Sequence, residues 1–521
     1  MKNFIPLALL LLVAFSSCQN NKQVKELQSG YYQEQFRPQY HFSPAKMWTN
    51  DPNGLVYYAG EYHLFYQYYP DSTVWGPMHW GHAVSRDLLK WEHLPIALYP
   101  DSLGYIFSGS AVIDTLNTSG LGQPGKPAMI AIFTYHDPKG EKKGTMNFQY
   151  QGLAFSLDKG RTWTKYSKNP VLPNPGLRDF RDPSVSWNNA AGKWIMTMAA
   201  GDHVRFYSSE NLISWKLESE FGKAIGAHGG VWECPSLFEM NVSNEPGKKI
   251  WVLLVSINPG GPNGGSATQY FTGTFDGHTF KNDDNGIRWV DYGPDNYAGI
   301  LWSNTGDRRI FLGWMNNWNY ANKVPTSPWR GQMTIPRELS LISLNSKYFL
   351  RSYPVAELDK ITHPIINNST ENGAVIKLND ENAGQIRIDF DIPENIESLS
   401  IGLSTDSGQA IEYGYYRKEG KIIWGRSMSG NAAFSDAFSN KGFSAHVNEF
   451  SAEHSVTILV DHCSAEFFFD KGLTSMTTLF FPRKEFTKIK LYTIPFSASI
   501  KNLKVSSIES VWSKQDKPGE K

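Results

Sequence analysis

The stretch Asn50-Asp51-Pro52-Asn53-Gly54 decides the fold, because its pattern of a carboxylate close to a proline returns twice along the chain. It returns as Arg181-Asp182-Pro183 and as Trp232-Glu233-Cys234-Pro235. Each motif is followed by a short apolar run, a polar turn or loop, and a second run rich in apolar and aromatic residues. A repeated unit that carries an acid at one structural position brings the acids together if the units close into a ring.

The region from Tyr40 to Ser352 shows short strand patterns and tight turns and lacks long helical patterns. The spacing predicts inner strands that start near five residues: Asp51, Phe107, Asp182, Glu233 and Tyr297. These starts follow one another at intervals that suit the ~40–50-residue period of propeller blades with added loops. We therefore expect a five-bladed β-propeller over residues 38–353. A single β-sandwich would not place the acids at equivalent repeat positions.

The C-terminal region carries a second set of alternating strand patterns. Residues 354–370 are interpreted as a linker, and residues 371–508 as a β-sandwich, because seven or more short strands follow one another there. The expected strands are Gly373–Leu378, Gln385–Phe390, Ser398–Ser404, Ala410–Tyr416, His454–Val460, Ala465–Phe469 and Lys488–Thr493. No acid–proline motif of the propeller kind recurs in this region, so we expect a supporting or accessory sugar-binding role. Residues 509–521 are expected to form a tail.

The N-terminus resembles an export signal. Lys2 precedes an apolar stretch from Phe4 to Phe15 that is too short to span a bilayer. Ser16-Ser17-Cys18 resembles the cleavage site of a bacterial lipoprotein. We expect residues 1–18 to be the signal region with Cys18 lipidated, residues 19–37 to be a flexible tether, and the protein to be anchored to the cell envelope at a periplasmic or surface face of the outer membrane. Phe15 stands where that site usually has Leu, so cleavage without lipidation stays open.

Composition excludes several classes of partner. The 521 residues include 50 basic and 50 acidic side chains, so the formal net charge is zero and nothing favours nucleic acid or an anionic membrane surface. We expect membrane attachment through the lipid anchor alone, and a monomer. Aromatic residues make up 14% of the chain, and most are expected to pack in cores. Trp48, Trp75, Trp80 and Trp232 lie in or near the acid motifs, where sugar rings could stack on them.

The three cysteines do not indicate a disulfide or a metal site. Cys234 and Cys463 fall in different predicted domains, and neither has a second Cys or clustered His at metal-ligand spacing. We expect no metal and no cofactor. No base is paired with Cys234 in the sequence, so a small buried neighbour of Glu233 is a better interpretation than a nucleophile.

The three acids suit the cleavage of a glycosidic bond, which needs one group to protonate the leaving oxygen and a carboxylate to attack or stabilise the anomeric carbon. Asp51 is short and lies on an inner strand, which suits attack. Glu233 has the longer reach of an acid, and burial beside Trp232, Cys234 and Pro235 should raise its pKa. Arg181 should keep Asp182 ionised for binding sugar hydroxyls. A lone Asp-Pro is usually a turn, so the inference depends on three acid–proline units at equivalent positions.

Together with further motifs, these residues resemble glycoside hydrolase family 32, the invertase, inulinase and levanase family. The resemblance covers residues 38–508. The matching stretches are Phe42-Ser43-Pro44-Ala45-Lys46-Met47-Trp48-Thr49-Asn50-Asp51-Pro52-Asn53-Gly54, Leu64-Phe65-Tyr66-Gln67-Tyr68, Trp75-Gly76-Pro77-Met78-His79-Trp80-Gly81-His82, Phe107-Ser108-Gly109-Ser110, Phe180-Arg181-Asp182-Pro183, Trp232-Glu233-Cys234-Pro235, Asp291-Tyr292-Gly293, Thr334-Ile335-Pro336-Arg337-Glu338-Leu339 and Ser464-Ala465-Glu466-Phe467-Phe468.

The resemblance implies a propeller followed by a sandwich, and a retaining mechanism. In that mechanism Asp51 is the nucleophile, Glu233 the general acid and then base, and Asp182 the stabiliser of the transition state. The implied fructose-binding residues are Trp48, Asn50, Gln67, Trp75, Phe107, Ser108, Arg181 and Trp318, with Trp318 favoured over Trp314. Thr49 departs from the usual Met and could reshape the pocket floor. Ala465 replaces a common Val, which is a packing change.

The loop Asn258–Ser266, continued by Gln269-Tyr270-Phe271, resembles that of microbial exo-inulinases and levanases. We therefore expect fructose to be released from fructan ends, with sucrose also accepted. Endo-cleavage of levan, fructosyl transfer and an inverting reaction of the family 43 type stay open as alternatives. A glycan-binding lipoprotein without catalysis is the alternative from a different class.

Overall fold

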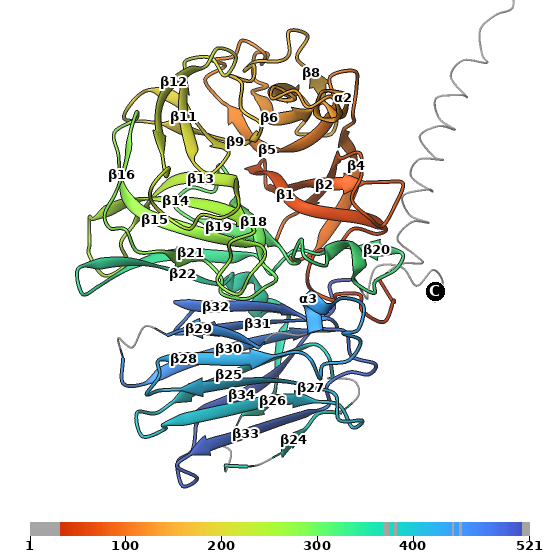
Figure 1. Ribbon diagram of the computed structural model, residues 1–521, viewed down its shortest axis with the longest axis vertical. Coiled ribbons are helices and arrows are strands. Elements are labelled where there is room, and N and C mark those ends of the chain that lie inside the picture. Colours follow the sequence, from red (N-terminus) through yellow and green to blue (C-terminus); the bar gives the residue numbers. More distant parts are fainter. Residues whose placement is uncertain are drawn as a thin grey trace, which may run out of the picture.

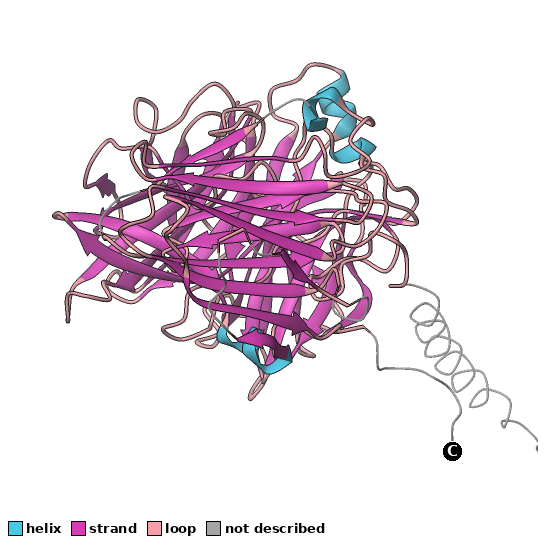
Figure 2. Cartoon of the chain, turned by 90° about the horizontal axis from the view of Figure 1, so that it is seen from below, coloured by secondary structure: helices cyan, strands magenta, loops and turns pink. Residues whose placement is uncertain are grey.

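The computed structural model describes residues 32–367, 372–373, 375–379, 383–439, 442–447 and 451–512. Most of their regular structure is β-strand, and the helices are short (Figure 1 and Figure 2). In these ranges no helix has the length and apolarity needed to cross a membrane. The expected all-β class is confirmed.

Five antiparallel sheets form the blades of a propeller, coloured from red to green in Figure 1. The first blade has β1 (Met47–Tyr58), β2 (Glu61–Tyr69), β3 (His79–Ser85) and β4 (Trp91–Leu98), and the second has β5 (Tyr105–Asp114), β6 (Ala128–His136), β7 (Gln149–Ser156) and β8 (Thr164–Lys165). The third has β9 (Phe180–Asn188), β10 (Lys193–Ala200), β11 (Val204–Ser209) and β12 (Lys216–Phe221).

The fourth blade has β13 (Val231–Asn241), β14 (Lys249–Asn258), β15 (Ala267–Phe275) and β16 (Phe280–Asn282), with β17 (Arg288–Trp289) also paired to β15. The fifth has β18 (Tyr297–Leu301), β19 (Ile310–Trp314), β21 (Arg337–Leu344) and β22 (Lys347–Pro354). A short helix, α2 (Pro138–Lys142), lies in the connection between β6 and β7.

The ring closes between the first and the fifth blade. Each innermost strand contacts the innermost strand of the next blade, and β18 contacts β1. In addition, β20 (Trp329–Arg330) follows the fifth blade's β19 in the chain but pairs in parallel with β1 of the first blade. The innermost strands β1, β5, β9, β13 and β18 contain or begin at the five expected starts, so the five-bladed propeller is confirmed.

All five innermost strands contain one extra residue at a corresponding step. Within 49–52, 106–109, 181–184, 233–236 and 297–300, two residues of the inner strand lie opposite one residue of its neighbour. Pro52, Pro183 and Pro235 lie in three of these bulges, where a residue without a backbone N–H does not interrupt a regular ladder. A β-bulge turns a side chain away from its regular direction. The acid–proline repeat is therefore the sequence signature of a bulge that aims an acid at the ring's axis.

The sandwich, coloured blue in Figure 1, has two six-stranded antiparallel sheets. One sheet contains β23 (Thr362–Asn367), β34 (Lys501–Ile508), β25 (Ile386–Ile392), β30 (His454–Asp461), β31 (Ser464–Phe469) and β32 (Thr474–Leu479). The other contains β24 (Val375–Lys377), β33 (Lys488–Ile494), β26 (Ser398–Ser404), β27 (Ala410–Tyr416), β28 (Lys421–Gly425) and β29 (Phe443–His446). Apolar residues of both sheets share one buried core.

Buried ion pairs join the propeller to the sandwich. Glu466 of β31 accepts hydrogen bonds from His41 Nε2 (2.8 Å) and the Ile335 backbone N–H (2.8 Å), and it also pairs with Arg337. Arg337 in turn contacts Asp291 (2.8 Å). Three of the family-like motifs, around residues 291, 337 and 466, thus lie at the domain contact and not at the propeller axis.

Several sequence-based boundaries differ from the structure. The expected linker 354–370 contains a 3₁₀ helix (Ala356–Ile361) and then β23, which pairs with β34 of the sandwich. Pro364 fits within β23 because this strand lies at the edge of its sheet. Strands β28, β29 and β32 were not expected from the sequence.

The chain ends also differ from expectation where they are described. Residues 32–37 of the expected tether are packed: Arg37 is fully buried, and the Tyr32 ring stacks on Trp512 (3.9 Å between centroids). The start of the expected tail is fixed as well, because Val511 N–H donates to Gln39 O (2.8 Å). Residues 1–31, which include Cys18, and residues 513–521 lie outside the described residues.

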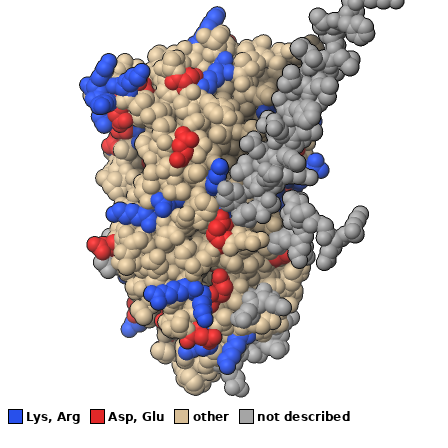
Figure 3. All heavy atoms as spheres, turned by 90° about the vertical axis from the view of Figure 1, so that its right-hand side faces the viewer, with Lys and Arg blue, Asp and Glu red and all other residues tan. Residues whose placement is uncertain are grey.

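Basic and acidic side chains are interspersed on the face shown in Figure 3. This mixture agrees with the formal net charge of zero. The visible part of this face offers no single-sign area of the kind that binds nucleic acid.

Candidate active site

Asp51 lies in the bulge of β1 and accepts two strong hydrogen bonds. Asn50 Nδ2 donates to Oδ1 (2.9 Å), and Ser108 Oγ from β5 donates to Oδ2 (2.8 Å). Asn50 is itself held by Trp48, whose Nε1 donates to the Asn50 amide oxygen (2.7 Å). Burial raises the pKa of Asp51, and the hydrogen bonds from Asn50 and Ser108 oppose this rise. These contacts hold the carboxylate in one orientation.

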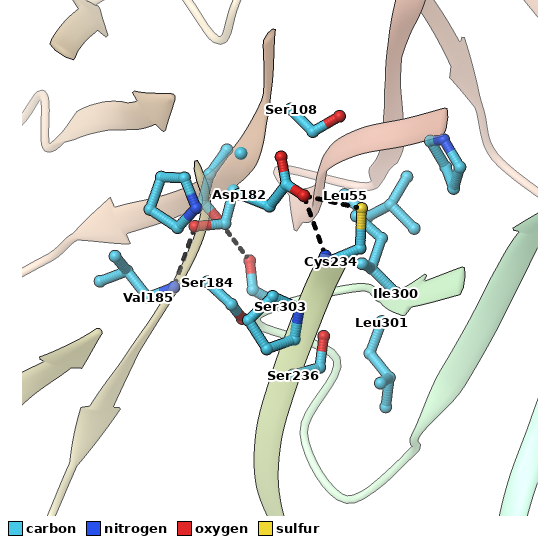
Figure 4. A pocket seen from close by; sticks show the side chains of 16 residues that line it. Leu55, Ser108, Asp182, Ser184, Val185, Cys234, Ser236, Ile300, Leu301 and Ser303 are labelled. Atoms are coloured by element: carbon cyan, nitrogen blue, oxygen red, sulfur yellow. Dashed lines mark hydrogen bonds between the residues drawn. The ribbon is translucent and has the colours of Figure 1, made fainter. Parts of the chain in front are cut away.

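Asp182 lies in the bulge of β9 with a positive φ of 62°. Its backbone N–H donates to Thr134 Oγ1 (3.0 Å), and its Oδ2 accepts from the Cys234 backbone N–H (3.0 Å). The Cys234 thiol lies 3.6 Å from Asp182 Oδ2, a contact drawn in Figure 4, and 3.7 Å from Asp51 Oδ2, so it sits between the two carboxyl groups. Asp51 and Asp182 therefore face each other across one small buried group.

Glu233 lies in the bulge of β13 and is held from two sides. Arg181 donates to its Oε1 through Nη2 (2.9 Å) and Nε (3.1 Å), and the Tyr297 hydroxyl of β18 donates to its Oε2. Arg181 also contacts Asp179 (2.6 Å), whereas its closest approach to Asp182 is 4.0 Å. Arg181 was expected to keep Asp182 ionised; its charge does lower the pKa of Asp182, but burial outweighs this effect, and the guanidinium donates its hydrogen bonds to Glu233 and Asp179.

Of the three acids, Glu233 and Asp182 have the largest pKa shifts, and their two pKa values differ. Burial raises the pKa of Glu233 to about 7, with Arg181 lowering it and the carboxyl groups of Asp182 and Asp51 raising it. Burial also raises the pKa of Asp182 to about 6, again against the effect of Arg181. Of these two groups, Glu233 holds its proton to higher pH. This arrangement suits a general acid beside groups that ionise earlier.

One cavity of about 290 Å³ brings the three acids together. Its walls come from all of the first four blades, and Trp318 from the loop after β19 covers a further side. Besides the acids, it is lined by Asn50, Gln67, Trp75, Phe107, Ser108, Arg181 and Trp318, and also by His136, Glu141, Phe148, Gln149, Arg178, Asp179 and Asn258.

A second, narrow cavity of about 50 Å³ lies along the propeller axis, lined by residues of all five inner strands (Figure 4). Asp182, Cys234 and Ser108 border it from one side, and Leu301 and Ser303 line it further along. Asp182 and Ser108 line both cavities, so the two cavities adjoin at these residues. Within the described ranges, no group of three or more His, Cys, Asp or Glu residues could hold a metal ion.

The sequence matches two family models that together span nearly all the described residues. The N-terminal domain of glycosyl hydrolases family 32 matches residues 41–354, and the C-terminal domain of the same family matches residues 356–507. The chain belongs to glycoside hydrolase family 32. It is therefore a glycoside hydrolase, and the family resemblance inferred from the motifs is confirmed.

Similar proteins of known activity fall in the same family. A levanase of Bacillus subtilis is 45% identical over 98% of this chain and 74% of its own length. Invertase 1 of Saccharomyces cerevisiae is 44% identical over 64% of this chain and 62% of its own length. The crystal structure of an exo-inulinase from Aspergillus awamori has a TM-score of 0.84 and 34% identity, covering 92% of this chain and all of that one.

Most binding residues that the family 32 resemblance implies line the main cavity, but Trp48 does not. Trp48 is fully buried behind Asn50, where it holds the amide and packs against Trp318 (6.0 Å between centroids). Trp318 lines the cavity, whereas Trp314 is fully buried and does not. Thr49 is also buried, and its hydroxyl donates to Gln67 O (3.0 Å), so it is not part of the pocket floor.

Of the four tryptophans on which sugar rings were expected to stack, one lines the cavity. Trp75 is 39% exposed and lines the cavity with its ring against Phe107, whereas Trp80 and Trp232 are fully buried. Trp80 Nε1 donates to Phe107 O (3.0 Å), so it joins the first two blades.

Gln67 is buried, and its Nε2 has no hydrogen-bond partner among the described residues. This donor is therefore left for a ligand.

Sequence reasoning missed the contributions of Tyr297 and of the residues at the cavity mouth. Tyr297 was recognised only as the start of a fifth inner strand, yet its hydroxyl contacts Glu233. Its place in the repeat was a usable signal, because the register of the bulges makes Tyr297 of β18 equivalent to Glu233 of β13. Glu141 lies in the short helix α2 and Arg178 just before β9, both outside every motif, so no pattern indicates the direction of their side chains.

Proposed function

We propose that this chain is a retaining β-fructofuranosidase that releases terminal β-D-fructofuranosyl units from fructans such as levan and inulin, and from sucrose. The observation that carries the proposal is the meeting of Asp51, Asp182 and Glu233 in one cavity, with the pKa of Glu233 raised to about 7. Names of the similar proteins, a levanase, an invertase and an exo-inulinase, support fructosides as the substrate class.

The proposed reaction proceeds in two displacements at the anomeric carbon. Asp51 attacks this carbon while Glu233 gives its proton to the leaving oxygen, which forms a fructosyl-enzyme ester and frees the rest of the substrate. Glu233, now ionised, takes a proton from water, and that water cleaves the ester to release fructose. Asp182 accepts hydrogen bonds from fructose hydroxyls and favours the positively charged transition state.

The size of the cavity favours action at chain ends. Its volume of about 290 Å³ is near the lower end of the ~300–1,000 Å³ range of small-molecule pockets. A terminal unit fits such a cavity more readily than an internal stretch of polymer. Endo-cleavage of levan is the main alternative, and it predicts oligosaccharides as first products in place of fructose.

Product analysis on levan, inulin and sucrose tests the proposal. We expect free fructose from the first time points, and losses of at least about a thousandfold in Asp51→Ala and Glu233→Ala. Glu210→Ala, which changes an exposed acid, is the matched control. Unchanged function in both catalytic variants would favour a binding protein without catalysis. Proton NMR of the first-formed anomer separates retention from inversion, since β-fructose is expected first.

Fructosyl transfer would proceed through the same fructosyl-enzyme intermediate, because water and a sugar hydroxyl compete for it. The ratio of products therefore tests which reaction takes place. At high sucrose concentration, hydrolysis yields equal fructose and glucose. A transferase would yield glucose in excess over fructose, together with longer oligomers.

We propose further that the protein is exported and anchored through a lipid on Cys18. The N-terminal pattern of Lys2, the apolar stretch to Phe15 and Ser16-Ser17-Cys18 supports this proposal. The full chain expressed in a bacterium with lipoprotein processing should partition into detergent, and Cys18→Ser should move it to the aqueous phase. Equal partition of both forms would overturn the anchor and leave export open.

A further inference from the structure

The mouth of the main cavity is built on one side by the connection between β6 and β7, which carries α2. Asp137 caps this helix, because its side chain accepts a hydrogen bond from the Lys139 backbone N–H. Glu141 projects from α2 into the cavity wall, and Arg178, just before β9, lines the same wall. Neither residue belongs to a motif or contacts one of the three acids.

Glu141 is anchored through a buried histidine. His136 Nε2 donates to Glu141 Oε2 (3.0 Å), while Gln149 Nε2 approaches His136 Nδ1 at 3.4 Å. Gln149 can only donate through this nitrogen, so Nδ1 is the acceptor and the ring is neutral with its proton on Nε2. Burial lowers the pKa of His136, which agrees with a neutral ring. The anchor leaves Glu141 Oε1 directed away from His136.

Glu141 and Arg178 form a polar pair that the protein does not close. Arg178 Nη2 lies 4.0 Å from Glu141 Oε1, which is too long for a hydrogen bond, and both side chains are about half exposed. The Arg178 guanidinium lies over the Phe148 ring (5.6 Å). A carboxylate that can accept and a guanidinium that can donate, 4.0 Å apart, suit adjacent hydroxyls of a sugar.

We propose that Glu141 and Arg178 bind the hydroxyl groups of the sugar unit that follows the terminal fructose, and so select substrates by their leaving sugar. The inference rests on the proposed function, because it requires a fructosyl unit held at Asp51. The leaving unit must extend from Glu233 towards the mouth, and the wall that carries Glu141, Phe148 and Arg178 lines that mouth. The α2 connection is then a determinant of specificity and not of bond cleavage.

Two substrates that differ only in the leaving group test this inference. Levanbiose or sucrose presents sugar hydroxyls beyond the scissile bond, whereas 4-nitrophenyl β-D-fructofuranoside presents none there. We expect Glu141→Ala and Arg178→Ala each to lower kcat/KM on the sugar substrates about tenfold, since hydrogen bonds to charged groups contribute roughly 1.5–3 kcal/mol. On the nitrophenyl substrate both variants should stay within about twofold of the wild type.

Glu141→Gln should retain part of the sugar-substrate activity, because its amide oxygen still accepts from His136. Lys142→Ala, on the same helix but outside the cavity wall, is the matched control and should change neither substrate. Equal losses on both substrates would mean that α2 acts on the catalytic groups, and no loss on either would mean that the pair contacts no sugar; each result overturns the inference. Failure of the wild-type protein to cleave any fructoside would instead refute the proposed function.

Discussion

Glu233 owes its raised pKa first to burial, and its neighbours then adjust that value in opposite directions. Arg181 lowers the pKa of Glu233, while Asp182 and Asp51 raise it. In the proposed mechanism Glu233 must be protonated to give its proton to the leaving oxygen, so activity is expected below this pKa and should be lost as pH rises through it. Single residues therefore decide the pH range of the enzyme.

The alkaline limb of kcat/KM on sucrose is expected near pH 7, from the pKa of Glu233. In Arg181→Gln the nearby positive charge is gone, so the pKa of Glu233 should rise further and the alkaline limb should move to higher pH. Overall activity should fall, since Arg181 also orients the carboxyl group. A limb that stays in place or moves to lower pH would contradict the assignment of this limb to Glu233.

Tyr297 is expected to act by positioning Glu233. Replacing Tyr297 with Phe removes only the hydroxyl that donates to Glu233 Oε2, so kcat should fall about tenfold, with KM changed little, for the loss of ~1–2 kcal/mol. Steady-state kinetics on sucrose measures both constants. A large rise in KM at constant kcat would instead indicate that the hydroxyl binds substrate.

At the scale of elements, the bulges of the innermost strands direct the side chains of the site. Gly54 lies in a second bulge of β1, between Asn53 and Val56, with a φ of +52°, and a Cβ at this residue would lie 2.8 Å from atoms of both Phe65 and Trp80. Both rings are fully buried and cannot move aside. The glycine of the first motif is thus required by the close packing of the rings against the strand that carries Asp51.

Gly54→Ala should destabilise the fold by more than Gly60→Ala does. Gly60 also has a positive φ, +86°, but has open space around it. Gly60→Ala therefore measures only the backbone strain, which is about 1–2 kcal/mol. Gly54→Ala adds an overpacking cost of about 1–3 kcal/mol and should lower activity by shifting Asp51. Urea unfolding of both variants measures the difference. Equal stabilities would show that the rings yield.

At the scale of the whole molecule, buried charges hold the two domains together. Burial alone would lower the pKa of His41, but its hydrogen bonds to Asp461 and Glu466 outweigh this and raise the pKa to about 9. Glu466 and Asp461 have lowered pKa values, since hydrogen bonds and charges from Arg337 and His41 outweigh their burial. The contact thus depends on an ionised cluster shared by both domains.

The midpoint of thermal unfolding should reflect His41 at alkaline pH. A raised pKa means that its contribution is complete below the usual histidine value near 6.5 and is lost as pH rises through about 9. The wild-type midpoint should therefore fall between pH 7 and 10, and His41→Gln should start lower and show a flatter decline. Parallel declines in calorimetry would mean that His41 is not the group that titrates.

Part of the site was predictable because it is repeated. The acids Asp51, Asp182 and Glu233 stand beside prolines in repeating strands, and the ring follows from that repeat. Trp48, Trp80 and Trp232 show the limit of this reasoning. Trp232 lies next to Glu233 in the sequence, yet successive side chains of a strand point to opposite faces, and all three rings are fully buried.

The amino-acid sequence by itself determined the fold class and the positions of the three acids, because proline and acid are local features of three of the five inner strands. Tertiary structure decided which groups surround the acids. The direction of Arg181 towards Glu233, the hydroxyl of Tyr297 and the unclosed pair of Glu141 and Arg178 depend on contacts between blades. Residues distant in the chain acquire such contacts only when the ring closes, and burial in that closed ring is what raises the pKa of Glu233.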